Sequence, residues 1–179
     1  MHNTSNTIFS EKVEFMRILL LAMVIPGLLM IFLPLFLQPQ EGFPKVILPI
    51  IGIILLLLAY ASKTLDITLT DEQLIFGYSK MKSKVNLSDI KETRIEDFKF
   101  RNFGGYGIRI GRMNKKKVVG YIPKGGKGLF IKNVKHKNYF IISNRAEELQ
   151  SLINDRIKIL KKKRPDEHVS SPGVEETHR

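Results

Sequence analysis

Two apolar stretches decide the fold: residues 18–37, ILLLAMVIPGLLMIFLPLFL, and residues 46–61, VILPIIGIILLLLAYA. The first holds twenty residues without a charge, and a membrane-spanning helix needs about twenty. The second holds sixteen uncharged residues, and the span reaches nineteen if Phe43, Pro44 and Lys45 form its interfacial end. At about 1.5 Å per residue, nineteen residues reach about 28 Å, close to the thickness of the hydrocarbon layer. We therefore expect two transmembrane helices, at 18–37 and 43–61.

Residues 18–37 and 46–61 contain no Asp, Glu, Lys, Arg or His. A buried helix of a soluble protein keeps a polar stripe, and 18–37 has none. Ionisable residues inside a membrane usually mark a transport pathway, so their absence argues against a transporter or channel. We interpret Pro26, Pro34 and Pro49 as tolerated kinks because no polar group accompanies them. The segment 18–61 is thus expected to be an anchor.

Residues 1–17 form a polar leader of mixed charge, expected in the cytoplasm. Phe9, Val13, Phe15 and Met16 suggest a short interfacial helix within it. No small-residue cleavage site follows the long apolar stretch, so we expect the first helix to be retained.

The orientation is predicted from the basic residues near the ends of the spans. The outer flanks carry four of them: Lys12, Arg17, Lys63 and Lys80. The loop 38–45 between the spans carries only Lys45. Both termini, and the domain that follows the anchor, are therefore expected in the cytoplasm.

After Ser62 the pattern changes to that of short strands. Residues 65–70 alternate apolar and polar side chains, and Asp71 and Glu72 then form a turn into 73–78, so a β-hairpin is predicted. Further strands are expected at 85–90, 92–95, 107–110, 118–121, 129–133 and 139–142. About seven short strands at this spacing are typical of an antiparallel sandwich or barrel.

A helix closes the domain, which we place at 62–164. Asn144, followed three residues later by Glu147, resembles a capping box. Apolar residues then recur at helical spacing at Leu149, Leu152, Ile153, Ile157 and Leu160. Pro165 ends the helix, and the polar residues 165–179 are expected to be a disordered tail.

Several stretches carry a resemblance: GGYGIR at 104–109, Gly120-Tyr121, GLFIK at 128–132 and YFIISNRAEEL at 139–149. Across residues 65–153 the chain resembles a family of small bacterial membrane proteins with a pleckstrin-homology-like (PH-like) domain. The resemblance implies one or two N-terminal membrane helices, a mainly-β barrel plugged by a C-terminal helix, and a place in the bacterial cytoplasmic membrane. Most members have no assigned function, so it implies no catalytic residues.

The glycines of this chain are interpreted as structural. Gly104, Gly105 and Gly107 do not match the Gly-x-Gly-x-x-Gly pattern and do not open a predicted helix. The stretch 124–128, KGGKG, lacks the leading glycine of a P-loop, and Gly128 stands where Ser or Thr would bind magnesium. We expect tight turns or bulges at these positions rather than a nucleotide site.

Charge is the most informative functional signal. The chain has a formal net charge of +12, and residues 98–146 hold thirteen Lys and Arg but no Asp or Glu. The candidate lipid- or phosphate-binding residues are Arg109, Arg112, Lys115, Lys116, Lys117, Lys124 and Lys127. Beside a cytoplasmic leaflet, such residues attract anionic lipid by about 1 kcal/mol each.

Other functions remain open. The basic surface could be merely solvated, with a protein partner docked on a strand edge or on the closing helix. Nucleic acid is disfavoured because no aromatic-rich basic strand, helix-turn-helix or zinc site accompanies the charge. The chain has no cysteine, and no catalytic set, metal-ligand cluster or cofactor motif is visible. We therefore expect a membrane-anchored, non-catalytic binding or scaffolding module without a cofactor or metal.

Overall fold

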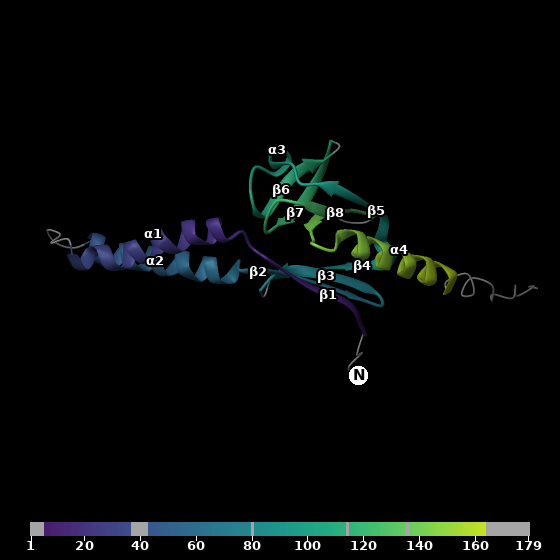
Figure 1. Cartoon of the computed structure of the whole chain (residues 1–179), viewed down its shortest axis with the longest axis horizontal. Helices are drawn as coiled ribbons and strands as arrows, with labels where there is room; N and C mark the ends of the chain where they lie inside the picture. Colours follow the sequence, from purple (N-terminus) through teal and green to yellow (C-terminus); the bar gives the residue numbers. More distant parts are fainter. Residues whose placement is uncertain (1–5, 37–42, 80, 114, 135–136, 164–179) are drawn as a thin grey trace, which may run out of the picture.

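The computed structural model describes residues 6–36, 43–79, 81–113, 115–134 and 137–163, and its elements are shown in Figure 1. The helices are α1 (Arg17–Phe36), α2 (Phe43–Ala61), the short α3 (Phe100–Phe103) and α4 (Ala146–Lys163), with a 3₁₀ turn, η1, at Leu87–Asp89. The strands are β1 (Thr7–Glu14), β2 (Thr64–Thr70), β3 (Gln73–Tyr78), β4 (Met81–Asn86), β5 (Ile90–Asp97), β6 (Gly107–Met113), β7 (Lys116–Ile122), β8 (Lys127–Asn133) and β9 (Asn138–Ile142). The predicted tail lies outside the described residues.

Helices α1 and α2 form a hairpin that projects from the β domain (Figure 1). The two helices touch closely where Gly27 faces Gly52, since a Cβ at Gly52 would lie 2.5 Å from the Gly27 carbonyl oxygen. Among the described helices, α1 alone is both long and apolar enough to cross a membrane, and the apolar part of α2, Val46–Ala61, is shorter. Within the described residues, one helix, near the N-terminus, therefore meets the requirements of a span.

Strands β1 to β4 form one sheet in sequence order, and every pair in it is antiparallel. The hairpin of β2 and β3 confirms the predicted turn. The short helix expected in the leader is wrong, because Thr7–Glu14 is a strand whose Glu14 lies opposite Thr64 of β2. The leader thus folds with the domain that follows the helices.

The second sheet has the order β5-β8-β9-β7-β6. Strands β7 and β9 pair in parallel, with Val119 opposite Tyr139, so the expectation of a purely antiparallel domain is wrong. The strand expected at 85–90 is also wrong, because η1 separates β4 from β5 there. Together the two sheets give a mainly-β domain closed by the C-terminal helix.

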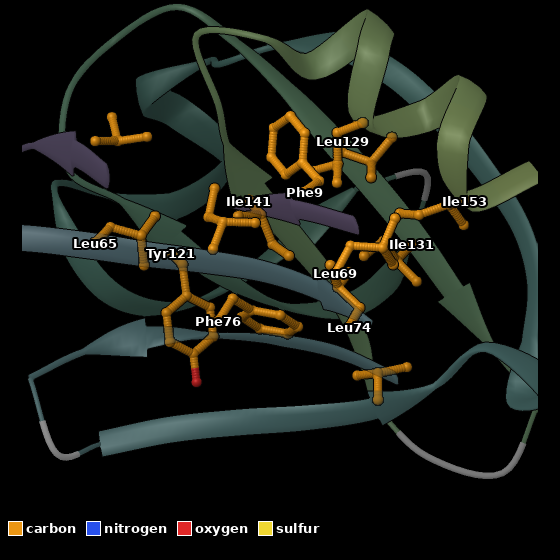
Figure 2. Packing of buried hydrophobic residues seen from close by; sticks show 14 of the residues in the cluster. Phe9, Leu65, Leu69, Leu74, Phe76, Tyr121, Leu129, Ile131, Ile141 and Ile153 are labelled. Atoms are coloured by element: carbon orange, nitrogen blue, oxygen red, sulfur yellow. The ribbon is translucent and has the colours of Figure 1, made fainter. Parts of the chain in front are cut away.

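The main hydrophobic core lies between the two sheets and α4 (Figure 2). Leu65, Leu69, Leu129 and Ile131 are fully buried in it, and α4 contributes Ile153, which is also fully buried. A second, smaller cluster contains Phe103, Met113, Val118, Ile122, Phe130, Phe140 and Ile142. The side chains of β7 alternate between the two clusters: Val118 and Ile122 belong to the second cluster, and Tyr121 belongs to the first.

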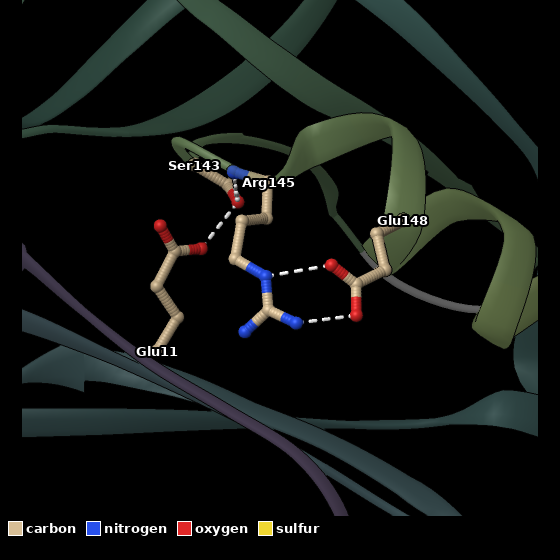
Figure 3. A network of polar contacts seen from close by, with 4 residues as sticks. All are labelled: Glu11, Ser143, Arg145 and Glu148. Atoms are coloured by element: carbon tan, nitrogen blue, oxygen red, sulfur yellow. Dashed lines mark hydrogen bonds and ion pairs between the residues drawn. The ribbon is translucent and has the colours of Figure 1, made fainter.

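A polar network ties β1 to the start of α4 (Figure 3). The Glu11 carboxylate accepts hydrogen bonds from the Ser143 hydroxyl and, at 2.9 Å, from the Asn144 backbone amide. The Ser143 oxygen in turn accepts a bond from the Arg145 amide. Arg145 pairs with Glu148, and this hydrogen bond raises the pKa of Arg145. The leader thus supplies a partner that the capping pattern of the helix did not reveal.

Candidate anion-binding surface

The loop between β7 and β8 lies at the base of the helix hairpin. The backbone amide of Met16, one residue before α1, donates a hydrogen bond of 2.9 Å to the carbonyl oxygen of Pro123. The neighbouring amide of Phe15 donates to the carbonyl oxygen of Lys63, two residues after α2. Both helices therefore leave the domain beside Pro123 and Lys124. We call this end of the second sheet the helix-proximal end.

The register of the second sheet shows which other segments lie at the helix-proximal end. Gly107 at the start of β6 lies opposite Ile122, and Asp97 at the end of β5 lies opposite Lys127. The segment that joins these two strands, with α3 inside it, therefore begins and ends at this end of the sheet. Within this segment, the Phe98 amide donates a hydrogen bond of 2.9 Å to the Gly126 carbonyl oxygen, so Lys99 follows a residue held at this end. The Phe100 ring lies 6.3 Å from that of Tyr106, the residue before β6.

The predicted basic residues divide between the two ends of the sheet. Lys124 and Lys127 lie at the helix-proximal end, whereas Lys115, Lys116 and Lys117 lie at the turn between β6 and β7. Strand β7 separates the groups by about 20 Å, at about 3.3 Å per residue. They do not form one patch, and each group has to be judged by its own surroundings.

At the helix-proximal end the two lysines differ. The Lys127 ammonium lies 2.9 Å from the Glu147 carboxylate, and this hydrogen bond raises the pKa of Lys127. Lys124 has no ion pair with any described residue and is half-buried. Lys127 therefore has an internal counter-ion, and Lys124 is the better candidate for an external anion.

Helix α3 adds a basic-aromatic group that the sequence did not predict. Phe100 is 59% exposed although it is a large apolar side chain, and it stands between exposed Lys99 and Arg101. Its ring lies 6.3 Å from that of Tyr106. The alternation in the stretch 98–103, FKFRNF, is more typical of a strand than of a helical turn, so the sequence signal was misleading.

Glycines in the sheet let α3 lie directly on it. A Cβ at Gly111 would lie 2.3 Å from the Asn102 carbonyl oxygen, and a Cβ at Gly120 would lie 2.7 Å from the Phe103 ring. Phe103 itself is buried, and its ring stacks on Phe140. The absence of two side chains thus brings α3 against β6.

This contact forms an open cleft of about 470 Å³ between α3 and the hairpin of β6 and β7. Its lining residues are Arg101, Asn102, Ile110, Gly111, Arg112 and Lys117. Arg112 and Lys117 are cross-strand neighbours, and α3 supplies Arg101. None of these three cations forms an ion pair with a described residue. The cleft is therefore a second candidate site for an anionic group.

The remaining predicted residues lie elsewhere. Lys116 is close enough to Glu92 to help lower the pKa of that carboxyl, after the larger effect of the hydrogen bond from Arg94. The Arg109 side chain turns back and donates to the Tyr106 carbonyl oxygen at 2.9 Å. Lys115 is exposed in the turn with a φ of 63°. Only Arg112 and Lys117 of the predicted set line the cleft.

The glycine stretch before β6 adopts backbone conformations that favour glycine. Gly104 and Gly107 have φ values of 69° and 90°, and Gly105 has 153°. Gly104 ends α3 by donating its amide to the Phe100 carbonyl oxygen at 2.7 Å. The stretch therefore has a structural task, which is to end the helical turn and return the chain to β6.

No model of a known protein family matches the sequence, and no curated protein matches it. The geometry of the domain therefore has to carry any functional conclusion.

Proposed function

We propose that the protein is a membrane-anchored, non-catalytic binding module whose helix-proximal end contacts anionic lipid headgroups. The observation that carries this proposal is the hydrogen bond from Met16 to Pro123, because it fixes Lys124 beside the entry to α1. A basic group at the base of a membrane anchor lies within the reach of the leaflet's surface potential.

The membrane anchor is supported by the surface of the helix hairpin. Large apolar side chains are exposed along both helices, among them Ile25, Phe32, Leu35, Ile53 and Leu57. Such a continuous apolar surface is unfavourable in water and fits a lipid environment. Helix α2 has nineteen residues, of which the apolar part is Val46–Ala61, and it packs along α1, so we propose that both helices span the membrane.

The proposed orientation places both termini and the β domain in the cytoplasm. It rests on the excess of Lys and Arg on the outer flanks, since such residues favour the cytoplasmic side. A cytoplasmic leaflet is also the one that carries the anionic lipids. We retain a PH-like domain of bacterial type as part of the proposal, supported by the mainly-β domain and its closing helix.

The chemistry of the helix-proximal end fits a lipid surface. Exposed Arg17 and Lys63 flank the two helices, and Lys99 and Lys124 extend the basic surface over the domain. Phe100 adds an apolar side chain of the kind that enters the interface between headgroups and acyl chains. Cations around an exposed aromatic ring are expected to bind headgroups and the interface together.

The test uses the full chain in lipid nanodiscs with spin-labelled phosphatidylglycerol and phosphatidylcholine. The fraction of immobilised spectrum reports which lipid is preferred at the protein. Lys99→Gln with Lys124→Gln should reduce the preference for phosphatidylglycerol by at most about thirtyfold, at about 1 kcal/mol per residue. In about 1 M salt the preference of the parent protein should also fall, because the Debye length is then about 3 Å.

The matched control is Lys115→Gln with Lys137→Gln, which removes the same charge at the other end of the sheet. This control should retain the preference. Equal losses in the two variants would mean diffuse attraction, and no preference in the parent protein would end the lipid proposal.

A further inference from the structure

Strand β6 is an unprotected edge of the second sheet. It is last in the strand order and pairs only with β7. All seven of its residues, from Gly107 to Met113, pair in continuous register without a bulge. Among the backbone hydrogen bonds of described residues outside the ladders, none involves β6. Its outer side thus offers a regular row of backbone donors and acceptors, which is a template for another strand.

The other three edges are protected, each in a different way. Helix α4 covers β5, where Asn154 and Gln150 bind the Thr93 hydroxyl and carbonyl oxygen. Strand β4 exposes Lys82 and Lys84, and charged side chains on an edge disfavour pairing. Strand β1 has a register shift between Thr7 and Phe9. Strand β6 also carries two exposed cations, Arg109 and Arg112, which disfavour pairing with another basic strand but not with an acidic one.

The side chains around this edge indicate what would pair with it. Ile110 is 65% exposed and lines the cleft together with Arg112, Lys117 and Arg101. No Asp or Glu occurs anywhere from Phe98 to Ala146, so nothing in that part of the sequence neutralises these cations. A strand that carries acidic side chains would meet complementary charge, and its apolar residues would cover Ile110.

We propose that the free edge of β6 binds an extended acidic segment of a partner protein, which adds to the sheet as a sixth strand with a carboxylate in the cleft. Backbone hydrogen bonds supply affinity for any extended chain, and the three cations select acidic side chains. The site uses Arg112 and Lys117, which the proposed lipid contact does not. Failure of one proposal therefore leaves the other untouched.

The probe is a synthetic peptide of alternating glutamate and valine, as long as β6. Full-length protein in nanodiscs of neutral lipid should bind it, as measured by fluorescence anisotropy. Hydrogen exchange should show new protection of β6 amides and little change in β4. Two further peptides carry N-methyl groups, one at every odd residue and one at every even residue, and both keep the charge of the probe. Because alternate amides of a strand point to opposite sides, one of these two peptides loses every amide donor that would face β6. That peptide should bind about tenfold more weakly, or weaker still, because ladder hydrogen bonds are lost.

Arg112→Gln with Lys117→Gln should also weaken binding of the probe about tenfold, as expected for two exposed charge contacts. The control, Lys115→Gln with Lys137→Gln, removes equal charge outside the cleft and should bind like the parent protein. The proposal is overturned if both N-methylated peptides bind as tightly as the unmodified probe. It is also overturned if a lysine-valine peptide binds as tightly as the glutamate-valine probe, or if the probe does not bind at low salt. If β6 amides are already protected in the absence of peptide, and this protection disappears on dilution, the edge pairs with a second copy of this chain. That result would also overturn the proposal.

Discussion

The backbone amide of Met16 donates a hydrogen bond to the carbonyl oxygen of Pro123, across 2.9 Å. In the sequence these residues are far apart, because Met16 precedes the two helices and Pro123 follows them. The bond joins the end of the leader to the loop after β7. Together with the pairing of β1 and β2, it makes the leader part of the β domain and sets which end of the second sheet lies next to the helices.

The packing of β1 gives the first prediction. Val13 is fully buried between the sheets, so Val13→Ala should lower the free energy of unfolding by about 1–3 kcal/mol through lost contacts and a small cavity. Lys12→Ala, at the exposed neighbouring position, should change it by less than about 0.5 kcal/mol. Urea unfolding of the full chain in detergent, followed by near-ultraviolet circular dichroism, measures both. Equal effects would mean that β1 does not pack in the domain.

The second prediction concerns Gly107, whose φ of 90° is unfavourable for a β-branched residue. Gly107→Val should cost about 1–3 kcal/mol and lower the melting temperature by several degrees. Gly125→Val is the control, because its backbone is not in the left-handed region and the nearest atom to a new Cβ lies at 4.0 Å. If both variants melt like the parent protein, the backbone at Gly107 is not constrained as described.

The third prediction is a dependence of stability on pH at the alkaline end. Burial raises the pKa of Tyr78, whose hydroxyl has no partner among the described residues. The folded state holds this proton more tightly than the unfolded state, so the stabilisation is complete below the unfolded pKa of about 10 and is lost as pH rises above it. Tyr78→Phe should leave stability unchanged or raise it by about 1 kcal/mol at neutral pH, and should weaken the alkaline loss.

Tyr121→Phe provides the contrast, because the Tyr121 hydroxyl lies 2.7 Å from that of Ser83. This variant should lose about 1 kcal/mol at neutral pH. Burial also raises the pKa of Tyr139, so some alkaline dependence should persist in Tyr78→Phe. Urea unfolding at a series of pH values measures these effects, and a loss of stability in Tyr78→Phe at neutral pH would reveal an unseen partner of its hydroxyl.

The fourth prediction is the orientation in the membrane. A reporter that works only in the cytoplasm should be active when fused after Arg179 and inactive when inserted at Glu41. The reason is the four-to-one excess of basic residues on the outer flanks. The reverse pattern would place the domain outside the cytoplasm and remove the reason to expect anionic lipid beside it.

The parts of the fold that were predictable from the sequence are those with a local signal. The apolar run of α1, the β2–β3 turn and the 3.6-residue spacing of Leu149 and Ile153 each occur within one short stretch. Strand β1 and the residue after it also carry alternating apolar residues, at Phe9, Val13 and Phe15, but Glu11 interrupts the pattern. That glutamate binds Ser143, a partner that cannot be known before the fold is known.

The candidate sites were less predictable because they depend on which strands become neighbours. Composition identifies the basic segment but does not distinguish its members. Arg112 lines the cleft, whereas Arg109 turns back and donates to Tyr106. The parallel pairing of β7 with β9 joins strands that are separated in the sequence by β8, and no turn signal marks it. The contribution of Arg101 follows from a four-residue helix that is too short for a periodic pattern.

The most direct test of the central proposal measures which end of the domain lies at the membrane. The chain has no cysteine, so single cysteines at Gly125 and at Val134, which lie at opposite ends of β8, can each carry a fluorophore. The full-length protein is reconstituted with lipids that carry a nitroxide quencher on the headgroup. We predict strong quenching at position 125 and little at position 134. Equal quenching at both positions, or stronger quenching at 134, would contradict contact of the helix-proximal end with the lipid surface.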